Sequence, residues 1–266
     1  MLRDITIGQY YQADSVIHRL DPRVKLLGTF AYVISVFIFR NIPGFLLMTA
    51  FIWLCIGLSK VPFKFMVKGL KAIAFILVLT GFVNLFLTPG APVFEWKFIA
   101  ISKQGIYNTI YMITRLTYLV VGTSLMTLTT TPTRLTDGME TGLNFLNKIK
   151  VPVHEIAMMM SIALRFIPIL MEETDKIMKA QIARGADFES KNIVKKIKSM
   201  VPLLVPLFIS AFRRANDLAM AMEARCYRGG EGRTKMKPLV YHGRDRVAYM
   251  VLLAFFAICI LTRIFF

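Results

Sequence analysis

Two arginines flanked by small residues are the side chains in this sequence best suited to recognising a partner. They lie in Ala183-Arg184-Gly185 and Ala224-Arg225-Cys226, with the arginines 41 positions apart. A guanidinium offers five donors in a planar fork, which matches a carboxylate or a pair of carbonyl oxygens. Each arginine closes a long amphipathic pattern, where the helix dipole also favours a cation. One such ending is ordinary helix termination, but two similar endings indicate a paired docking device.

Catalytic and metal chemistry, by contrast, is poorly represented in the sequence. No Gly-x-x-x-x-Gly-Lys-Ser/Thr loop is present to cradle ATP, and no nucleophile with a base in reach stands out. The histidines are scattered and lack metal-ligand spacing: His18, His154 and His242. The cysteines show no disulfide or metal pattern: Cys55, Cys226 and Cys259. We therefore expect a non-catalytic chain that binds no metal and no cofactor.

The composition indicates that the elements holding these residues lie in a membrane. Hydrophobic residues make up 56% of the 266 positions, yet the formal net charge is +17. A bilayer accepts apolar side chains on every face of a helix, whereas a soluble core of this size cannot. We predict an all-α polytopic membrane protein with about five transmembrane helices. The predicted spans are Lys25–Phe39, Phe45–Leu58, Leu70–Leu87, Ile106–Leu128 and Val247–Phe266.

The distribution of positive charge predicts the orientation and the domains. Residues 131–245 hold 19 Lys and Arg against 12 Asp and Glu, and residues 60–71 hold lysines without an acid. By the positive-inside rule both segments face the cytoplasm, with the N-terminus inside and retained. We predict a membrane region with four spans over 1–130, a cytoplasmic helical domain over 131–245 and a last transmembrane helix over 246–266. The basic excess suits anionic lipid headgroups, and no nucleic-acid recognition pattern is present.

Three helices are predicted within the cytoplasmic segment. The first covers Arg134–Ile149 with Thr133 as its N-cap, and the others cover Val153–Arg184 and Asn192–Arg225. Both long helices contain prolines, which should bend or break each of them into two pieces near the membrane plane: Pro168, Pro202 and Pro206. Gly185 and the loop that begins at Tyr227 end the two helices.

Arg115 is the charged residue that lies well inside a predicted span. One interpretation is a pivot or a charge that contacts lipid or a partner. The other, which we favour, is an arginine that faces the helix bundle and is satisfied by carbonyls and hydroxyls. All of the acidic residues lie outside the predicted spans, which argues against a proton- or sodium-driven carrier. Any energy for transport would have to come from a partner.

These features together resemble the transmembrane T component of energy-coupling factor (ECF) transporters, importers of the ATP-binding-cassette (ABC) type. The resemblance covers the whole chain. It rests on the opening His18-Arg19-Leu20-Asp21-Pro22-Arg23-Val24-Lys25, the early spans, the two arginine signatures, the Tyr227-Arg228-Gly229-Gly230 stretch and a last span. In the opening, Asp21 suits the N-cap and Pro22 the first position of the first span. The departure is Cys226, where the family pattern has glycine.

The resemblance implies a scaffold in the plasma membrane of a prokaryote. Two cytoplasmic ABC-type ATPases, which bind the ATP, would each receive one signature in a groove. A membrane-embedded S component would bind a vitamin or a metal ion and pack against the coupling helices. The implied ATPase-docking residues are Ala183, Arg184, Gly185, Ala224, Arg225 and Cys226, and the implied S-component contacts are Met158, Met159 and Met171.

Two other functions stay open at this stage. A conventional importer permease would form its own substrate path and would need polar groups converging within its spans. A membrane-anchored interaction or nucleic-acid protein would not need five spans.

Overall fold

The chain folds into two compact units of helices. The structure is a computed structural model that describes residues 10–39, 41–89, 92–96, 99–186, 188, 193–230 and 236–265. The first unit, here the bundle unit, comprises Gly8–Thr141 and Leu239–Phe266. The second, here the hairpin unit, comprises Met1–Ile7 and Gly142–Pro238. The predominantly helical architecture confirms the predicted fold class.

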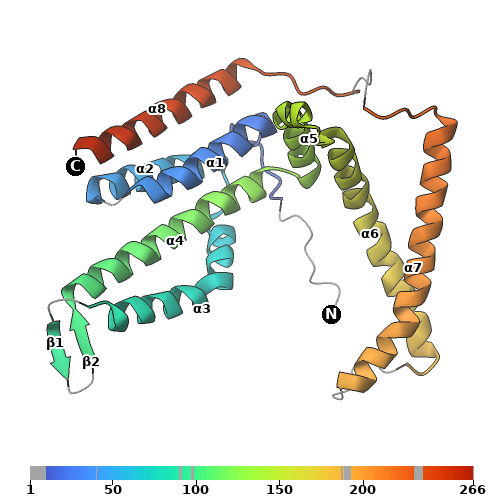
Figure 1. The fold of residues 1–266 in the computed structure, drawn as a ribbon, viewed down its shortest axis with the longest axis horizontal. Coiled ribbons are helices and arrows are strands. Elements are labelled where there is room, and N and C mark those ends of the chain that lie inside the picture. Colours follow the sequence, from blue (N-terminus) through green and yellow to red (C-terminus); the bar gives the residue numbers. More distant parts are fainter. Residues whose placement is uncertain are drawn as a thin grey trace. The chain divides into compact units, whose positions relative to one another are not determined.

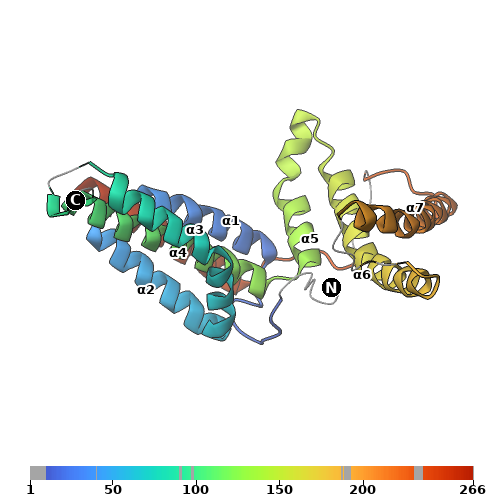
Figure 2. The same cartoon turned by 90° about the horizontal axis from the view of Figure 1, so that it is seen from below.

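The bundle unit is built around one long helix. This is α4 (Lys103–Thr129), which packs against α1 (Pro22–Ile38), α2 (Ile42–Ser59) and α3 (Phe63–Leu87). The last helix, α8 (Gly243–Phe265), packs against α1 and α2 although most of the sequence separates it from them. Figures 1 and 2 show α1, α2 and α4 side by side. The C-terminal helix therefore belongs to the same body as the first four.

Local sequence signals set where these helices begin. The Asp21 side chain accepts a hydrogen bond from the Arg23 backbone N–H, and Pro22 occupies the first turn of α1, as predicted. At the start of α4, the Ser102 hydroxyl accepts a hydrogen bond from the Gly105 N–H at 2.9 Å. Both caps satisfy amide groups that have no partner within their own helix.

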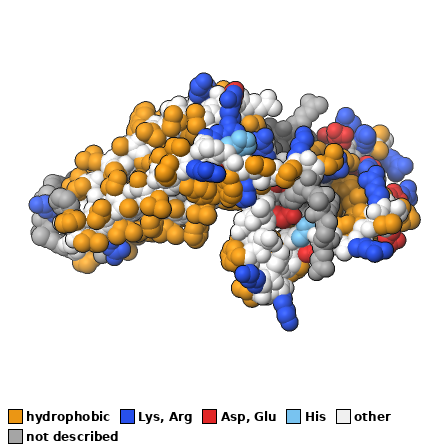
Figure 3. Space-filling model, turned by 90° about the horizontal axis from the view of Figure 1, so that it is seen from above, with side chains coloured by type: hydrophobic (Ala, Val, Ile, Leu, Met, Phe, Trp, Pro, Cys, Tyr) orange, Lys and Arg blue, Asp and Glu red, His pale blue; other side chains and the backbone are white. Residues whose placement is uncertain are grey.

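The core of the bundle unit is apolar and is drawn from α1, α2, α3, α4 and α8. Tyr32, Met48, Val121 and Cys259 are all buried there. The rings of Phe51 and Phe255 stack with centroids 4.1 Å apart, joining α2 to α8. Outside this core the helices expose many large hydrophobic side chains, and Figure 3 shows them covering the bundle. Such a coat is expected of helices that face lipid or a membrane partner.

The predicted spans agree with the structure in part. By length and composition, α2 and α8 could each cross a membrane, and α3 could if its parts Phe63–Lys71 and Ile73–Leu87, which meet at a 60° bend, form one span. Helix α1 contains only 17 residues. Among the described residues, neither α1 nor α4 is both long enough and apolar enough to cross a membrane by the same measure. Both nevertheless pack inside the bundle, where neighbouring helices rather than lipid cover part of their surface.

A short β-hairpin connects α3 and α4, between the predicted spans Leu70–Leu87 and Ile106–Leu128, where no strand was predicted. Strand β1 (Pro92–Trp96) pairs antiparallel with β2 (Ile99–Ser102), with Trp96 opposite Ile99. The register shifts between Pro92 and Phe94. Aromatic and β-branched residues in this segment favour strand pairing.

The helix predicted over Arg134–Ile149 is wrong as a single element. The structure has α5 (Pro132–Gly142) followed by a separate 3₁₀ helix, η2 (Asn144–Ile149). The division falls at Gly142, whose low helix propensity makes continuation costly. Helix α5 also begins earlier than predicted, because Pro132 takes the first position and the Thr131 hydroxyl accepts from the Arg134 N–H at 3.4 Å.

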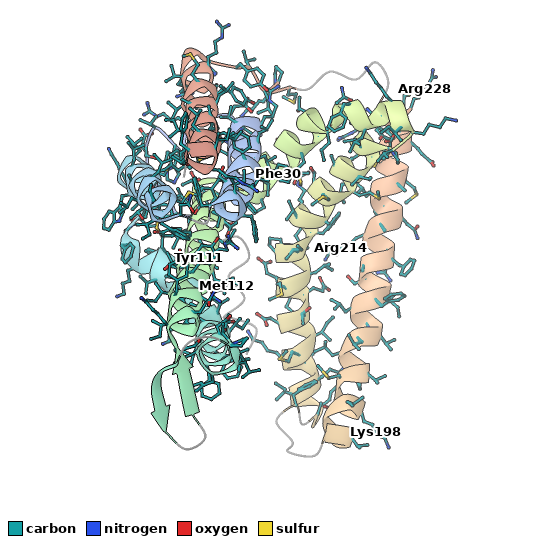
Figure 4. The ribbon with its side chains drawn as sticks, turned by 60° about the vertical axis from the view of Figure 1, so that its left-hand side comes forward. Phe30, Tyr111, Met112, Lys198, Arg214 and Arg228 are labelled. Atoms are coloured by element: carbon teal, nitrogen blue, oxygen red, sulfur yellow. The ribbon has the colours of Figure 1, made fainter. Side chains whose placement is uncertain are left out.

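The hairpin unit consists mainly of two long antiparallel helices. These are α6 (Val153–Ala183) and α7 (Ile193–Ala224), which pack against each other and cross near the end of α6 in Figure 1. An ion pair of 2.7 Å joins Arg214 to Glu173 between them, and Figure 4 shows Arg214 between the two ribbons. The predicted boundaries of both helices hold within a residue.

Of the bend or break predicted at the prolines of these helices, the break does not occur. Helices α6 and α7 continue through Pro168, Pro202 and Pro206. Proline has no N–H, so Pro206 leaves the carbonyl of Pro202 without its helical donor. The Gln181 side chain on α6 donates to that carbonyl oxygen at 3.3 Å. A contact from the neighbouring helix thus replaces the hydrogen bond that the proline removes.

Candidate functional site

The first arginine signature forms a regular helix end. At the end of α6, the Gly185 N–H donates to the Ile182 carbonyl at 2.9 Å and the Ala186 N–H donates to the Gln181 carbonyl at 3.0 Å. These two bonds define a Schellman motif, with Arg184 as the C-cap. Gly185 has φ +88°, a left-handed conformation that glycine adopts without strain.

The second signature forms the same helix end despite its cysteine. At the end of α7, the Cys226 N–H donates to the Glu223 carbonyl at 2.8 Å and the Tyr227 N–H donates to the Met222 carbonyl at 3.0 Å. Cys226 takes the left-handed conformation with φ +55°. The departure from glycine therefore changes the strain at this position but not the backbone path. Arg184 and Arg225 occupy equivalent positions in two equivalent motifs.

Both signature arginines are free to meet a partner. The side chains of Arg184 and Arg225 are exposed. Among the described residues, neither forms an ion pair or a side-chain hydrogen bond with the rest of the chain. The neighbouring Ala183, Ala224 and Cys226 are also exposed, and being small they leave room for another surface to approach each guanidinium.

The two signatures lie at opposite ends of the hairpin unit. Helix α6 has 31 residues, which corresponds to about 46 Å at 1.5 Å per residue. Because α6 and α7 are antiparallel, Arg225 lies near the start of α6, where a Cβ on Gly230 would clash with His154. Figure 4 shows the same separation along α7, with Lys198 at its start and Arg228 beyond its end.

Arg115 faces the bundle, as the favoured interpretation predicted, but only part of its guanidinium is hydrogen-bonded, since its buried Nε has no partner among the described residues. Its guanidinium donates to the Phe39 carbonyl oxygen at 3.0 Å and to the Tyr111 hydroxyl. It also lies over the Tyr111 ring at 4.5 Å and the Phe37 ring at 5.3 Å. Phe39 caps α1, so its carbonyl has no helical donor of its own. Together with Asn84 and Tyr107, this arginine lines a polar cavity of about 390 Å³.

Comparison with known proteins assigns the chain to a family. The family model described as cobalt transport protein matches residues 13–236. The energy-coupling factor transporter transmembrane protein EcfT of Clostridium kluyveri is 54% identical over 266 residues, covering 99% of this chain and 98% of the relative. That of Bacillus subtilis is 48% identical over 264 residues, covering 99% of this chain and all of the relative. This chain belongs to the T components of ECF transporters.

As a T component, the chain is a membrane component of a transporter, which confirms the predicted family, transport role and membrane association. The family model begins at residue 13 and therefore includes the opening motif and both arginine signatures. The roles of individual residues in docking are not part of these comparisons and are taken up below.

The three methionines predicted to contact an S component lie on α6 with different exposure. Met159 is 59% exposed, whereas Met158 and Met171 are partly buried. They belong to a stretch that also contains the exposed Ile156 and Met160. By length and composition alone, α6 could cross a membrane, although the sequence placed it in the cytoplasm. Its apolar half is unusual for a helix that lies fully in water.

A cluster of charged residues lies where α1 and α8 begin, and the sequence analysis predicted only its Asp21. Asp21 was expected as the cap of α1, but its environment includes Asp245, which is 1% exposed and lies at the start of α8. Arg23 forms a bidentate pair with Asp21, at 3.0 Å and 2.9 Å, and lies over the Tyr241 ring at 3.8 Å. The Asp21 carboxylate has a lowered pKa, because its bonds to Arg23 outweigh desolvation by burial. The sequence signal that could have indicated the role of Asp245 is its position as an acid in the first turn of the last helix.

The described residues contain no group of three or more histidine, cysteine or acidic side chains placed to hold a metal ion. The three cysteines are free thiols. His18 is buried in the bundle unit and bonded to the Ser15 hydroxyl and the Tyr11 carbonyl, at 2.7 Å and 2.9 Å. These histidine contacts are structural, since they connect the opening segment to itself.

Proposed function

We propose that this T component is the non-catalytic scaffold that couples two cytoplasmic ATPases to a substrate-binding S component. ATP would be bound by the ATPases and the vitamin or metal ion by the S component, so the chain itself would bind no cofactor. The names of the relatives support membership in such a transporter. The assignment of roles to residues is our proposal.

The observation that carries the proposal is the repeated helix end. Two Schellman motifs each present an exposed arginine at the C-cap, flanked by small exposed residues. Helix termination alone requires the left-handed residue at Gly185 and Cys226 but no arginine before it. A guanidinium that projects from a rigid helix end can form bidentate hydrogen bonds in an acidic or carbonyl-lined groove. Two equivalent ends suit two homologous ATPases.

The placement of the signatures also bears on how α6 and α7 meet the membrane. If the antiparallel pair crossed the bilayer, Arg184 and Arg225 would lie on opposite sides, since about 46 Å separates the ends of α6. Only one of them could then reach a cytoplasmic ATPase. We infer that the hairpin unit lies along the cytoplasmic face with both ends accessible there. This orientation agrees with the excess of Lys and Arg in residues 131–245.

The apolar half of α6 then needs another explanation than membrane crossing. Only 11% of its most apolar window is buried within the protein. We propose that this surface, including Met158, Met159 and Met171, meets the S component at the membrane. Methionine side chains are flexible and adapt to different partner surfaces.

Affinity purification of the assembled transporter tests the docking proposal. Arg184→Ala and Arg225→Ala should each weaken ATPase retention, and the double variant should lose the ATPases. Removing one partner of a buried hydrogen-bonded charge pair costs about 2–5 kcal/mol, or about thirtyfold or more in affinity. Arg→Lys should restore little of this, because lysine cannot form the bidentate contact. Arg228→Ala, which removes an exposed arginine beyond the helix end, is the matched control.

Membrane levels and S-component retention of each variant must be measured alongside. If the double variant keeps both ATPases and normal uptake, the two signatures have no docking role and serve only to end their helices. Loss of the S component together with the ATPases would indicate misfolding, which the Arg228→Ala control and a melting curve would separate from lost docking.

One observation favours a second function, that of a permease with its own substrate path. The polar cavity lined by Asn84, Asn108 and Arg115 lies among helices that flank the lipid-facing surface. Uptake by the chain and its ATPases in vesicles without any S component would support this alternative, provided that Arg115→Ala abolishes it.

A further inference from the structure

The bundle unit contains an apolar cavity of about 290 Å³ between α1, α2, α4 and α8. Its wall includes Val24 from α1, Ile52 from α2, Val121 from α4 and Val251 from α8. Almost all of the surface that lines it is apolar, although Lys25, Thr129 and Arg244 also border it. Its volume is close to the ~300 Å³ at which ligand pockets begin. The wall chemistry suits a hydrocarbon chain.

A second, polar cavity of about 670 Å³ adjoins the first. Arg19 from the opening segment, Arg134 from α5 and Arg244 from α8 line it, along with His18 and Asp14. Arg244 lines both cavities. The two cavities therefore lie against the same Arg244 side chain, and the polar one has a basic rim formed by three separate elements.

The residues that line the polar cavity carry more positive than negative charge, with three arginines against one aspartate. Asp14, the acid that lines the polar cavity, is already paired with Arg19, whose Nε donates to Oδ1 at 2.6 Å. Within the described ranges no ion pair involves Arg134 or Arg244. Their guanidinium groups therefore remain available to an anion from outside the chain.

A buried cation adds to the imbalance. Lys25 also lines the apolar cavity and is 8% exposed. Its ammonium donates only to carbonyl oxygens, those of His18 at 3.3 Å and Thr129 at 2.8 Å. Arg134 is near enough to repel it. A buried cation without a carboxylate is costly, and a nearby anion would reduce that cost.

We propose that the two cavities together form a binding site for one anionic phospholipid. An acyl chain would occupy the apolar cavity, and the headgroup phosphate would lie at Arg134 and Arg244. Free phosphate would leave the apolar cavity unused. A zwitterionic headgroup would bring an ammonium to a rim whose acid is already paired. An anionic lipid matches both the hydrocarbon wall and the unbalanced charge.

Lipid titration of the purified full chain tests this site. In a neutral detergent, phosphatidylglycerol should raise the melting temperature and should appear as one bound lipid in native mass spectra. Arg134→Gln with Arg244→Gln should weaken that binding by about tenfold or more, given the contribution of each basic residue near a headgroup. Ala248→Phe, which fills the apolar cavity from α8, should also remove the bound lipid.

Matched changes on the same helix serve as controls. Arg246→Gln and Ala254→Phe alter exposed residues that line neither cavity, and both should leave lipid binding unchanged. Melting temperatures without added lipid identify variants that fail to fold. Equal stabilisation by phosphatidylcholine would refute the proposal that the headgroup must be anionic. Equal stabilisation by inorganic phosphate would refute the proposal that the ligand is a lipid. Unchanged binding in Ala248→Phe would refute the placement of the acyl chain in the apolar cavity.

Discussion

The Asp245 carboxylate accepts a hydrogen bond from the backbone N–H of Asp21 at 2.9 Å, although 224 positions separate them in the sequence. Its other oxygen accepts from the His242 N–H at 2.8 Å, which is half of a capping box at the start of α8. One buried acid thus caps the last helix and connects it to the cap of the first. The opening motif is a structural junction between the two ends of the bundle unit.

Asp245→Ala should destabilise the bundle unit by about 2–4 kcal/mol. The change leaves the buried Asp21 N–H without an acceptor, at about 1–3 kcal/mol, and the partly buried His242 N–H without one, at about 1 kcal/mol. Thermal unfolding of the purified chain in detergent measures the loss. Arg246→Ala, one residue further along the same turn and exposed, should change the melting temperature little. Equal stability of the two variants would show that water replaces the lost acceptor.

The two signature ends should respond in opposite ways to exchange at their left-handed residue. Cys226→Gly should stabilise the end of α7 by up to about 1 kcal/mol, because a side chain at positive φ is strained. Gly185→Ala should destabilise the end of α6 by about 1 kcal/mol for the same reason. Both variants keep their arginines, so ATPase retention should persist. Hydrogen exchange of the terminal amides, at the end of each helix, measures both effects.

Cysteine labelling tests whether both ends of the hairpin unit face the cytoplasm. Cys226 is exposed near Arg225, and Lys198→Cys reports on the end near Arg184. Neither should react with an impermeant maleimide in intact cells, and both should react in inverted vesicles. Gln104→Cys is the positive control, because with the N-terminus inside a residue between the third and fourth predicted spans lies outside. Cys226→Ser gives the background. Labelling of one end from each side would mean that α6 and α7 cross the membrane.

His18 should make stability depend on pH. Burial is the largest cause that lowers its pKa below the ordinary value of 6.5. Above pH 6.5 the side chain is neutral in both the native and the unfolded state, so its contribution is fully present. As pH falls from about 6.5 toward the lower native pKa, the unfolded state takes up the proton first and stability decreases. In His18→Gln the melting temperature should change little with pH over this range. If it still falls as the pH is lowered, another titratable group causes the pH dependence.

Most of the local structure could be predicted from residue types and their spacing. Apolar runs and helical periodicity depend on neighbours a few residues apart, so the long helices were predicted with nearly correct ends. The caps at Asp21 and Gly185 were readable because they act within one turn. The paired signatures were likewise visible as residue types at two helix ends. The helix break at Gly142 and the β-hairpin were not predicted, because the intrinsic propensities of a few residues are weak evidence for such short elements.

Which of these elements meet could not be predicted from the chain and depends on packing between distant segments. The pairing of Asp245 with Asp21, the replacement of a lost helical donor by Gln181 and the lining of two cavities by Arg244 all connect residues from different helices. The placement of Arg184 and Arg225 at opposite ends also depends on the antiparallel packing of α6 on α7. Helical periodicity shows which face of a helix is apolar but not which helix covers it. That choice depends on side-chain packing between distant segments.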